Sequence, residues 1–436
     1  MKNLQVKPSS GFKGEITIPG DKSISHRAIM LGALARGETV VNNFLMSADC
    51  LATVKCFREM GVQIADSRKP NTEGRMIIIG KGLHGLVKPK ELLDVGNSGT
   101  TIRLISGVLA GQAFITKVTG DESIQQRPMR RIADPLRQMG ADIDGIRKGE
   151  ELYPPLKITG SKLSPISYSL PVASAQVKSA ILLAGLFAPG ETMVVEKVRS
   201  RDHTERLLKY YGAEIKTAGH EAKITGQKEF DGADISVPGD ISSAAFFLVA
   251  GAIIKESVLL IRNVGVNPTR TGIIDVLHRM GAEIDIENER ILSEEPRADI
   301  IINSSKLGGI KLDGEIIPRI IDEIPIIAVA ATQAEGVTEI RGAKELRIKE
   351  SDRIKTIATE LRKFGAKIEE LEDGLKITGP TKLKGARIES YGDHRIAMAM
   401  AVAGLIAEGE TTIENCDCVE TSFPGFEASL QKLWAR

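Results

Sequence analysis

Pro19-Gly20-Asp21-Lys22-Ser23-Ile24-Ser25-His26-Arg27 links a predicted strand to a predicted helix. Pro19-Gly20 ends an alternating strand over 15–18, and the next dozen residues have the apolar spacing of a helix. Ser23 is predicted to cap this helix. The free N–H groups of a helix start, together with Lys22 and Arg27, suit an oxyanion such as phosphate. An ordinary capped helix with solvated charges is the alternative.

Units of about 70 residues recur about six times, which predicts a repeat architecture. Each unit opens with a polar or charged cap and a helix of small apolar residues. A glycine turn, a strand, a second helix and a further strand follow. The predicted openings lie at 22–23, 97–100, 173–176, 240–243, 322–323 and 393–395. These repeats predict the α/β class.

Two segments, 16–21 and 235–240, both run from a strand into Pro-Gly-Asp and then a helix. An even division of the repeats predicts three in each of two domains, with the chain crossing between domains at these segments. One domain is then 20–239, and the other is 1–19 with 240–436. The Pro-Gly pairs near 19–21 and 238–240 are predicted hinges, with ordinary strand-to-helix turns as the alternative.

The composition is that of a large protein without a marked charge. The chain has 436 residues, 42% of them apolar, and a net charge of +1. It is long enough for two cores, and it shows no electrostatic footprint for nucleic acid or an anionic membrane. Four cysteines are too few for a disulfide framework, and Cys416-x-Cys418 lacks a partner pair at zinc spacing. Without a signal peptide or a membrane span, we expect a soluble, cytoplasmic protein that binds no metal.

Three segments of the first domain could bind an anionic ligand. Gly99 would let a ligand approach the backbone closely. Arg127 lies among three arginines beside a proline, and a planar guanidinium suits a carboxylate or phosphate. Gln176 and Lys178, at another helix start, suit a phosphorylated or polyhydroxylated ring. Each segment could instead be a helix start with only a structural role.

The candidates for acid–base chemistry lie mainly in the second domain. Asp322 stands between apolar runs, where burial could raise its pKa to a catalytically useful range. A helix cap with Pro325 in the first turn is the alternative. The segment 345–353 alternates in charge, as a solvated helix face also does. His203 could be a general base, but its charged neighbours favour a structural ion pair.

Helix starts from both domains thus carry cations and hydroxyls, and the repeats are predicted to point them at one cleft between the domains. Such a cleft would attract a ligand with several negative groups. One tryptophan and five tyrosines offer little base stacking. The chain contains no phosphate-binding loop, dinucleotide fingerprint or nucleophile elbow. ATP, GTP and NAD chemistry are therefore not expected.

Segments throughout the chain resemble the motifs of the 5-enolpyruvylshikimate-3-phosphate synthase family, in order. They are 20–23, 96–100, 127–129, 174–178, 201–205, 267–270, 346–353 and 393–395. The motif beginning at Arg201 resembles the bacterial subclass with weaker inhibition by glyphosate. The resemblance implies two inside-out α/β barrels with three βαβαββ repeats in each domain, closing on substrate. It also implies a reaction of shikimate 3-phosphate with phosphoenolpyruvate, without metal or organic cofactor. Glyphosate would compete, and a monomer is expected.

The resemblance also implies residue roles. Shikimate 3-phosphate would be held by Lys22, Ser23, Arg27, Ser174, Ala175, Gln176, Arg201, Asp322 and Lys349. Phosphoenolpyruvate would be held by Lys22, Gly99, Arg127, Gln176, Arg353 and Arg395. Asp322 would act on the 5-hydroxyl and Glu350 would protonate the methylene carbon, while a share of Lys22 in this proton transfer stays open.

Two other functions compete with this one. The sister enzyme acting on UDP-N-acetylglucosamine shares the fold but has a cysteine before the Arg-Pro motif, and 115–135 contains none. A non-catalytic anion-binding protein would leave Asp322 and Glu350 unexplained. One departure from the family pattern concerns 419–424, which lacks the phosphate-contacting lysine of some members.

Overall fold

The computed structural model describes residues 2–67 and 74–435 and divides the chain into two compact units. The N-lobe consists of Gly20–Val237 and Ile291–Glu295, and the C-lobe of Met1–Pro19, Pro238–Arg290 and Pro296–Arg436. The division differs from the predicted one in two places. Gly239 belongs to the C-lobe because its N–H donates to the carbonyl of Asn263. The segment 291–295 belongs to the N-lobe, where Ser236 N donates to Ser293 Oγ at 3.0 Å.

The three sheets of the N-lobe share one strand order, parallel in the first pair and antiparallel in the other two. The first is β14-β3-β5-β4, built from Asp234–Ser236, Arg36–Asn42, Arg75–Lys81 and Gln63–Asp66. The second is β6-β7-β9-β8, built from Leu93–Asp94, Ile115–Thr119, Glu151–Thr159 and Asp142–Lys148. The third is β10-β11-β13-β12, built from Ser167–Ser169, Glu191–Val195, Glu221–Thr225 and Ile215–Ala218. The last strand in sequence, β14, therefore completes the first repeat.

The C-lobe has a similar plan, and in it the N-terminal strands β1 and β2 pair with strands from much later in the chain. The first sheet is β16-β17-β15-β2-β24, built from Ile284–Leu292, Glu295–Asn303, Val258–Gly265, Gly11–Thr17 and Trp434–Ala435. The second is β18-β19-β21-β20, built from Lys311–Leu312, Gly336–Ile340, Gly374–Gly379 and Lys367–Leu371. The third is β1-β23-β22, built from Leu4–Val6, Thr411–Glu414 and Arg387–Glu389. Each contains one parallel pair followed by an antiparallel strand. In the sixth repeat β1 supplies that antiparallel strand.

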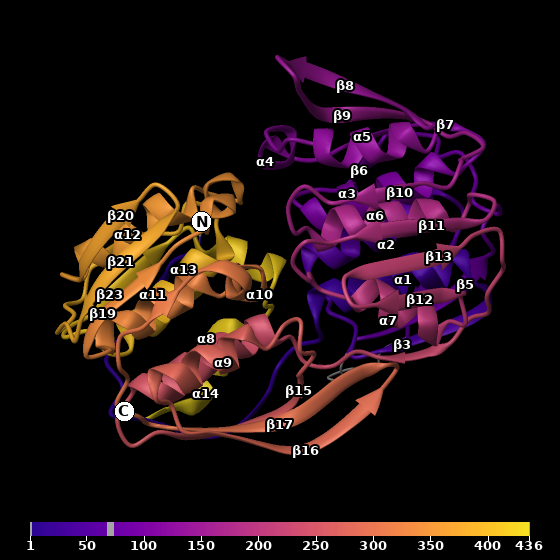
Figure 1. The fold of residues 1–436 in the computed structure, drawn as a ribbon. Coiled ribbons are helices and arrows are strands. Elements are labelled where there is room, and N and C mark those ends of the chain that lie inside the picture. The colour runs from indigo at the N-terminus through magenta and orange to yellow at the C-terminus, as the bar shows by residue number, and fades with distance from the viewer. Residues whose placement is uncertain (1, 68–73, 436) are drawn as a thin grey trace. The chain divides into compact units, whose positions relative to one another are not determined.

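The central helices of each lobe are buried along nearly their whole length. They are α1 (Lys22–Leu34), α3 (Gly99–Ala110) and α6 (Ala175–Gly185) in the N-lobe, and α8 (Ile241–Ile253), α11 (Ile324–Gln333) and α13 (His394–Gly404) in the C-lobe. A helix that is apolar all round must lie inside a core. Within each lobe these helices pack on one another, with the sheets around them (Figure 1). The predicted inside-out α/β repeats are confirmed.

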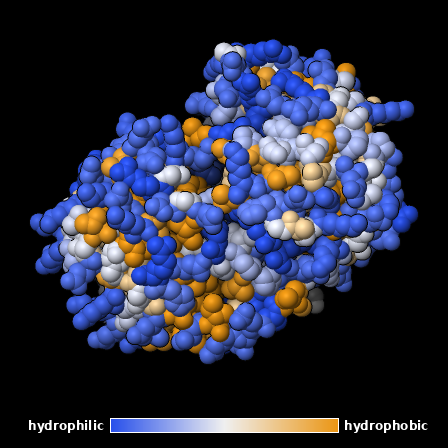
Figure 2. Space-filling model, in the orientation of Figure 1, coloured by the Kyte–Doolittle hydropathy of each residue, from blue (hydrophilic) through white to orange (hydrophobic). Residues whose placement is uncertain are grey.

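The remaining helices are short or have one polar face. They are α2 (Ala48–Glu59), α4 (Glu122–Gln125), α5 (Arg130–Gln138), α7 (His203–Tyr210), α9 (Gly272–Met280), α10 (Ile317–Ile320), α12 (Arg353–Lys363) and α14 (Phe426–Leu433), with 3-10 turns η1 (Gly314–Ile316), η2 (Lys344–Ile348) and η3 (Cys416–Thr421). On the face of each lobe in view, hydrophilic residues cover most of the surface (Figure 2). Within the described ranges, no helix has the length and apolarity that a membrane crossing requires.

The observed cap of α1 differs from the predicted one. Asp21, rather than Ser23, caps α1, because its Oδ1 accepts a hydrogen bond from Ile24 N at 2.9 Å. Ser98 caps α3 by accepting from Thr101 N at 3.1 Å. In both cases the acceptor lies three residues before the donor.

Candidate active site

The starts of α3 and α6 are in direct contact in the N-lobe. Gln176 Nε2 donates to Thr100 Oγ1 at 3.1 Å, and Arg103 donates to Gln176 Oε1. A Cβ on Gly99 would lie 2.7 Å from Nη1 of Arg127, so only glycine lets this guanidinium lie against the helix start. The predicted residues Gly99, Arg127 and Gln176 therefore lie together, with Arg103 as a further cation.

A buried chain of hydrogen bonds joins α1 to the start of α3. Thr101 Oγ1 donates to Ser98 Oγ at 2.7 Å, and Thr53 Oγ1 is 2.7 Å from Thr101 Oγ1. His26 Nδ1 is 2.6 Å from Thr53 Oγ1. Because each hydroxyl has one proton to donate, His26 must donate from Nδ1. One turn earlier, Lys22 forms an ion pair with Asp49, the second residue of α2.

Because His26 is buried in its neutral form, the free energy of unfolding should depend on pH in the acidic range. Burial lowers its pKa well below 6.5, and the nearby charges of Lys22 and Arg27 lower it further. Below pH 6.5 the unfolded chain therefore binds a proton that the folded chain does not. The free energy of unfolding should therefore decrease as the pH is lowered. Between pH 7.5 and 5.5, His26→Asn should lose about 1.4 kcal/mol less unfolding free energy than the wild type, measured by urea unfolding. His278→Asn, at an exposed position, should match the wild type; equal losses in all three would contradict this account of His26.

Arg27 is a buried cation that joins three helices. Its Nε donates to Thr204 Oγ1 at 2.6 Å, its Nη2 to Ser179 Oγ at 2.9 Å and its Nη1 to Ser23 O at 2.9 Å. Burial lowers the pKa of the guanidinium to about 10, and the charge of Arg201 contributes to this shift. Arg27 thus stays charged at neutral pH, with Arg201 within electrostatic reach. The sequence did not predict that Ser179 and Thr204 bind Arg27, because nothing in the local sequence distinguishes these two residues from other serines and threonines in helices.

Two other predicted candidates of the N-lobe have structural partners. Nδ1 of His203 lies 2.7 Å from Oε1 of Glu295, and both side chains are buried. His203 is therefore hydrogen-bonded to a buried carboxylate, in the structural role that its charged neighbours favoured. Lys178, expected to face a ligand, is instead only 2% exposed and lies between Glu196 and Glu205.

The predicted residues of the C-lobe form one charged cluster. Oδ1 of Asp322 lies 3.4 Å from Nη1 of Arg353, 3.7 Å from Nζ of Lys349 and 3.9 Å from Nε of Arg395. Oε2 of Glu350 accepts from Nη2 of Arg353 at 2.6 Å. The two carboxylates are therefore held by the same guanidinium. Asp322 does not cap α11, because its neighbour Glu323 occupies the N-cap position.

Arg353 is fully buried and ion-paired on several sides. Beyond Asp322 and Glu350, its Nε donates to Oδ2 of Asp393 at 2.8 Å. Burial alone would lower the pKa of Arg353, but Asp393, Glu350 and Asp322 outweigh burial and raise it. Asp393 also caps α13 by accepting from Arg395 N at 2.9 Å. This buried acid, which no local sequence signal identified as a partner of Arg353, thus binds the side chain of Arg353 and the backbone N–H of Arg395.

Cys416 and Cys418 are poorly suited to hold a metal. Their Sγ atoms donate to the carbonyls of Ile413 and Asn415. Burial raises the pKa of Cys416 to about 11 and that of Cys418 to about 12. Zinc binds the thiolate, which both cysteines therefore disfavour. Among the residues that the structure describes, no group of three or more His, Cys, Asp or Glu could hold a metal ion.

Comparisons with known proteins agree over nearly the whole chain. The family model described as EPSP synthase (3-phosphoshikimate 1-carboxyvinyltransferase) matches residues 6–430. The 3-phosphoshikimate 1-carboxyvinyltransferase of Bacillus thuringiensis is 55% identical over 434 residues, 99% of this chain and 100% of that protein. The Brevibacillus brevis protein of that name is 55% identical over 430 residues, 99% of each chain. A solved structure of EPSP synthase from Acinetobacter baumannii has a TM-score of 0.88 and 47% identity, covering 100% of this chain and 98% of that one.

Proposed function

Because the chain belongs to the EPSP synthase family, we propose that it transfers the enolpyruvyl group of phosphoenolpyruvate to the 5-hydroxyl of shikimate 3-phosphate. The products are 5-enolpyruvylshikimate 3-phosphate and phosphate. This is the step of the shikimate pathway that leads towards chorismate and the aromatic amino acids. The observation that carries the proposal is the pair of carboxylates, Asp322 and Glu350, held by one buried arginine.

The reaction needs an acid and a base at the same time. In the addition step the 5-hydroxyl loses its proton to Asp322 and its oxygen bonds to C2 of phosphoenolpyruvate, while Glu350 gives a proton to the methylene carbon. In the elimination step the new methyl group returns a proton to Glu350, the C2–C3 double bond forms again, the C2–O bond to phosphate breaks, and the proton held by Asp322 passes to the departing phosphate. Carboxyl groups tuned by their surroundings can do both. A part for Lys22 in this proton transfer stays a prediction.

The cationic helix starts support the substrate assignments. We propose that Lys22, Arg27 and Arg201 neutralise shikimate 3-phosphate. The hydrogen-bonding set for that substrate includes Ser23, Ser174, Ala175 and Gln176. Phosphoenolpyruvate would contact Gly99 and Arg127 in the N-lobe and Arg353 and Arg395 in the C-lobe, with Lys349 and Asp322 reaching shikimate 3-phosphate. Preorganised cations of this kind stabilise developing negative charge.

Phosphate release tests the proposed function. Purified protein mixed with shikimate 3-phosphate and phosphoenolpyruvate should release phosphate, and omission of either substrate should abolish release. Release with UDP-N-acetylglucosamine in place of shikimate 3-phosphate would identify the sister activity instead. Binding of both anions without any turnover would favour a non-catalytic anion-binding protein. Monomeric state and a cytoplasmic location stay predictions.

We further propose that glyphosate competes with phosphoenolpyruvate, which Gly99→Ala tests. The added methyl group displaces the Arg127 guanidinium and so weakens both ligands. It should also crowd glyphosate, which is longer than phosphoenolpyruvate. Overpacking costs about 1–3 kcal/mol, so the inhibition constant should rise about 5- to 150-fold beyond the change in KM for phosphoenolpyruvate. Initial rates at varied inhibitor give both constants. Equal changes in the two would refute selective crowding.

A further inference from the structure

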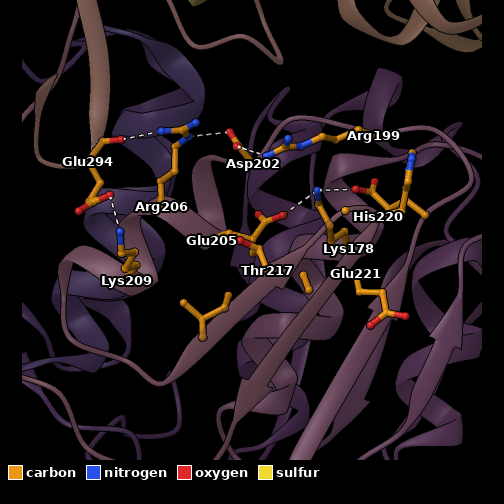
Figure 3. A pocket seen from close by; sticks show the side chains of 14 residues that line it. Lys178, Arg199, Asp202, Glu205, Arg206, Lys209, Thr217, His220, Glu221 and Glu294 are labelled. Atoms are coloured by element: carbon orange, nitrogen blue, oxygen red, sulfur yellow. Dashed lines mark hydrogen bonds and ion pairs between the residues drawn. The ribbon is translucent and has the colours of Figure 1, made fainter. Parts of the chain in front are cut away.

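A pocket beside α7 in the N-lobe has a floor of buried charges. Its volume is about 190 Å³, and the hairpin of β12 and β13 forms one side. Lys178 and Glu205 point toward one another at its floor (Figure 3). Along the wall, Asp202 forms one ion pair with Arg199 and another with Arg206. The residues that line the pocket include four basic and five acidic side chains, so no large excess of one charge is present to select a ligand.

Two of the charged residues at the floor, Lys178 and Glu196, instead contact Ser200 in the loop between β11 and α7. Nζ of Lys178 lies 2.7 Å from Oε2 of Glu196, 2.7 Å from Oε1 of Glu205 and 3.4 Å from the carbonyl oxygen of Ser200. Glu196 accepts hydrogen bonds from the hydroxyl of Ser200 and, at 3.4 Å, from its backbone N–H. Ser200 is therefore held by its N–H, its carbonyl and its hydroxyl. The next residue in the chain is Arg201.

Burying these charges is costly. Burial raises the pKa of Glu205, and Oε2 of Glu205 is buried without a hydrogen-bond partner. Apolar residues of similar size could fill such a space with equal or greater stability. A cluster of this kind is therefore better explained by the geometry that it imposes than by its contribution to stability.

Ser179 follows Lys178 in the chain and Thr204 precedes Glu205. Both of these neighbours contact Arg27, the second cation of the region. Ser179 and Thr204 both hydrogen-bond the Arg27 guanidinium. Ser179 and Thr204 also hydrogen-bond each other at 2.6 Å. One pair of helices, α6 and α7, thus fixes Arg27 directly and the loop carrying Arg201 through Ser200.

We infer that Lys178, acting with Glu196, is a positioning residue that fixes Ser200 and thereby aims Arg201 at the phosphate of shikimate 3-phosphate. This inference rests on the proposed function. Lys178 does not touch the substrate; it acts through Arg201. Its loss should therefore weaken shikimate 3-phosphate specifically and leave phosphoenolpyruvate and the chemical step nearly unchanged.

Steady-state kinetics of phosphate release test this. Lys178→Met should raise KM for shikimate 3-phosphate about 10- to 100-fold, the range for a lost charge-assisted contact, with kcat and KM for phosphoenolpyruvate within about threefold of the wild type. Calorimetric titration with shikimate 3-phosphate alone should show the same loss. Lys209→Met is the matched control, since Lys209 lies in the same pocket with a largely exposed side chain and should leave both constants unchanged.

A double-mutant cycle distinguishes positioning from general damage. In an Arg201→Met background, Lys178→Met should raise KM for shikimate 3-phosphate no further, because the residue through which it acts is already gone. Additive effects, or equal increases in both KM values, would overturn the inference. If Lys178→Met does not fold, Ser200→Ala removes the hydroxyl anchor alone and should show a smaller effect with the same non-additivity. A wild type that releases no phosphate would instead refute the proposed function, and this inference with it.

Discussion

Glu350→Gln and Asp322→Asn should each lower kcat by about 10²- to 10⁴-fold, the usual contribution of a positioned acid or base. Each change removes a titratable proton but keeps the size of the side chain and most of its contact with Arg353. The loss should therefore appear in kcat rather than in folding. Phosphate release in single-turnover and steady-state experiments measures it, and calorimetric titration confirms that shikimate 3-phosphate still binds.

The pH dependence of kcat tests the individual roles. If Glu350 is the acid and Asp322 the base in the addition step, the residual activity of Glu350→Gln should lose the decline at high pH. That of Asp322→Asn should lose the decline at low pH. Glu369→Gln, at an exposed position of β20 in the same lobe, should keep the full rate and both the low-pH and high-pH declines. Near-normal activity in either site variant would contradict the proposed chemistry.

Local sequence signals predicted the repeats and the ends of the central helices. Glycine turns, cap residues and apolar spacing are short-range features, so the starts of α3, α6 and α13 were found close to their observed positions. Such short-range signals could not predict that strands distant in the sequence, β14 and β1, complete the sheets of other repeats. The pairing of β14 with β3, and of β1 with β23, joins segments separated by most of a lobe or more.

Side-chain partners were harder to predict than helix ends. Lys178 was expected to face a ligand because it lies near a helix start, but its partners come from later in the chain, Glu196 from the loop after β11 and Glu205 from α7. The alternating charges of 345–353 likewise did not reveal that Arg353 is buried and that Asp393, forty residues away, is its partner. Periodicity specifies which face of a helix is buried. It does not specify which distant charge accompanies a buried one.

Arg353→Met should be the most destabilising single change considered. Three carboxylates, those of Asp393, Glu350 and Asp322, would lose their common cation, and Asp393 is completely buried. Removing one partner of a buried ion pair costs about 3–5 kcal/mol, which urea unfolding should detect. Lys355→Met, at an exposed position on the same helix, should change stability by no more than about 0.5 kcal/mol. Equal stability in the two variants would contradict a central role for Arg353.

Arg353→Met with Asp393→Asn then separates stability from catalysis. Neutralising Asp393 removes the most deeply buried of the uncompensated charges, so the double variant should recover part of the lost unfolding free energy. It should not recover kcat, because Asp322 and Glu350 still lack the guanidinium that holds them both. Recovery of activity together with stability would show that Arg353 serves only the fold. Recovery of stability alone would show that the buried arginine also arranges the acid and the base.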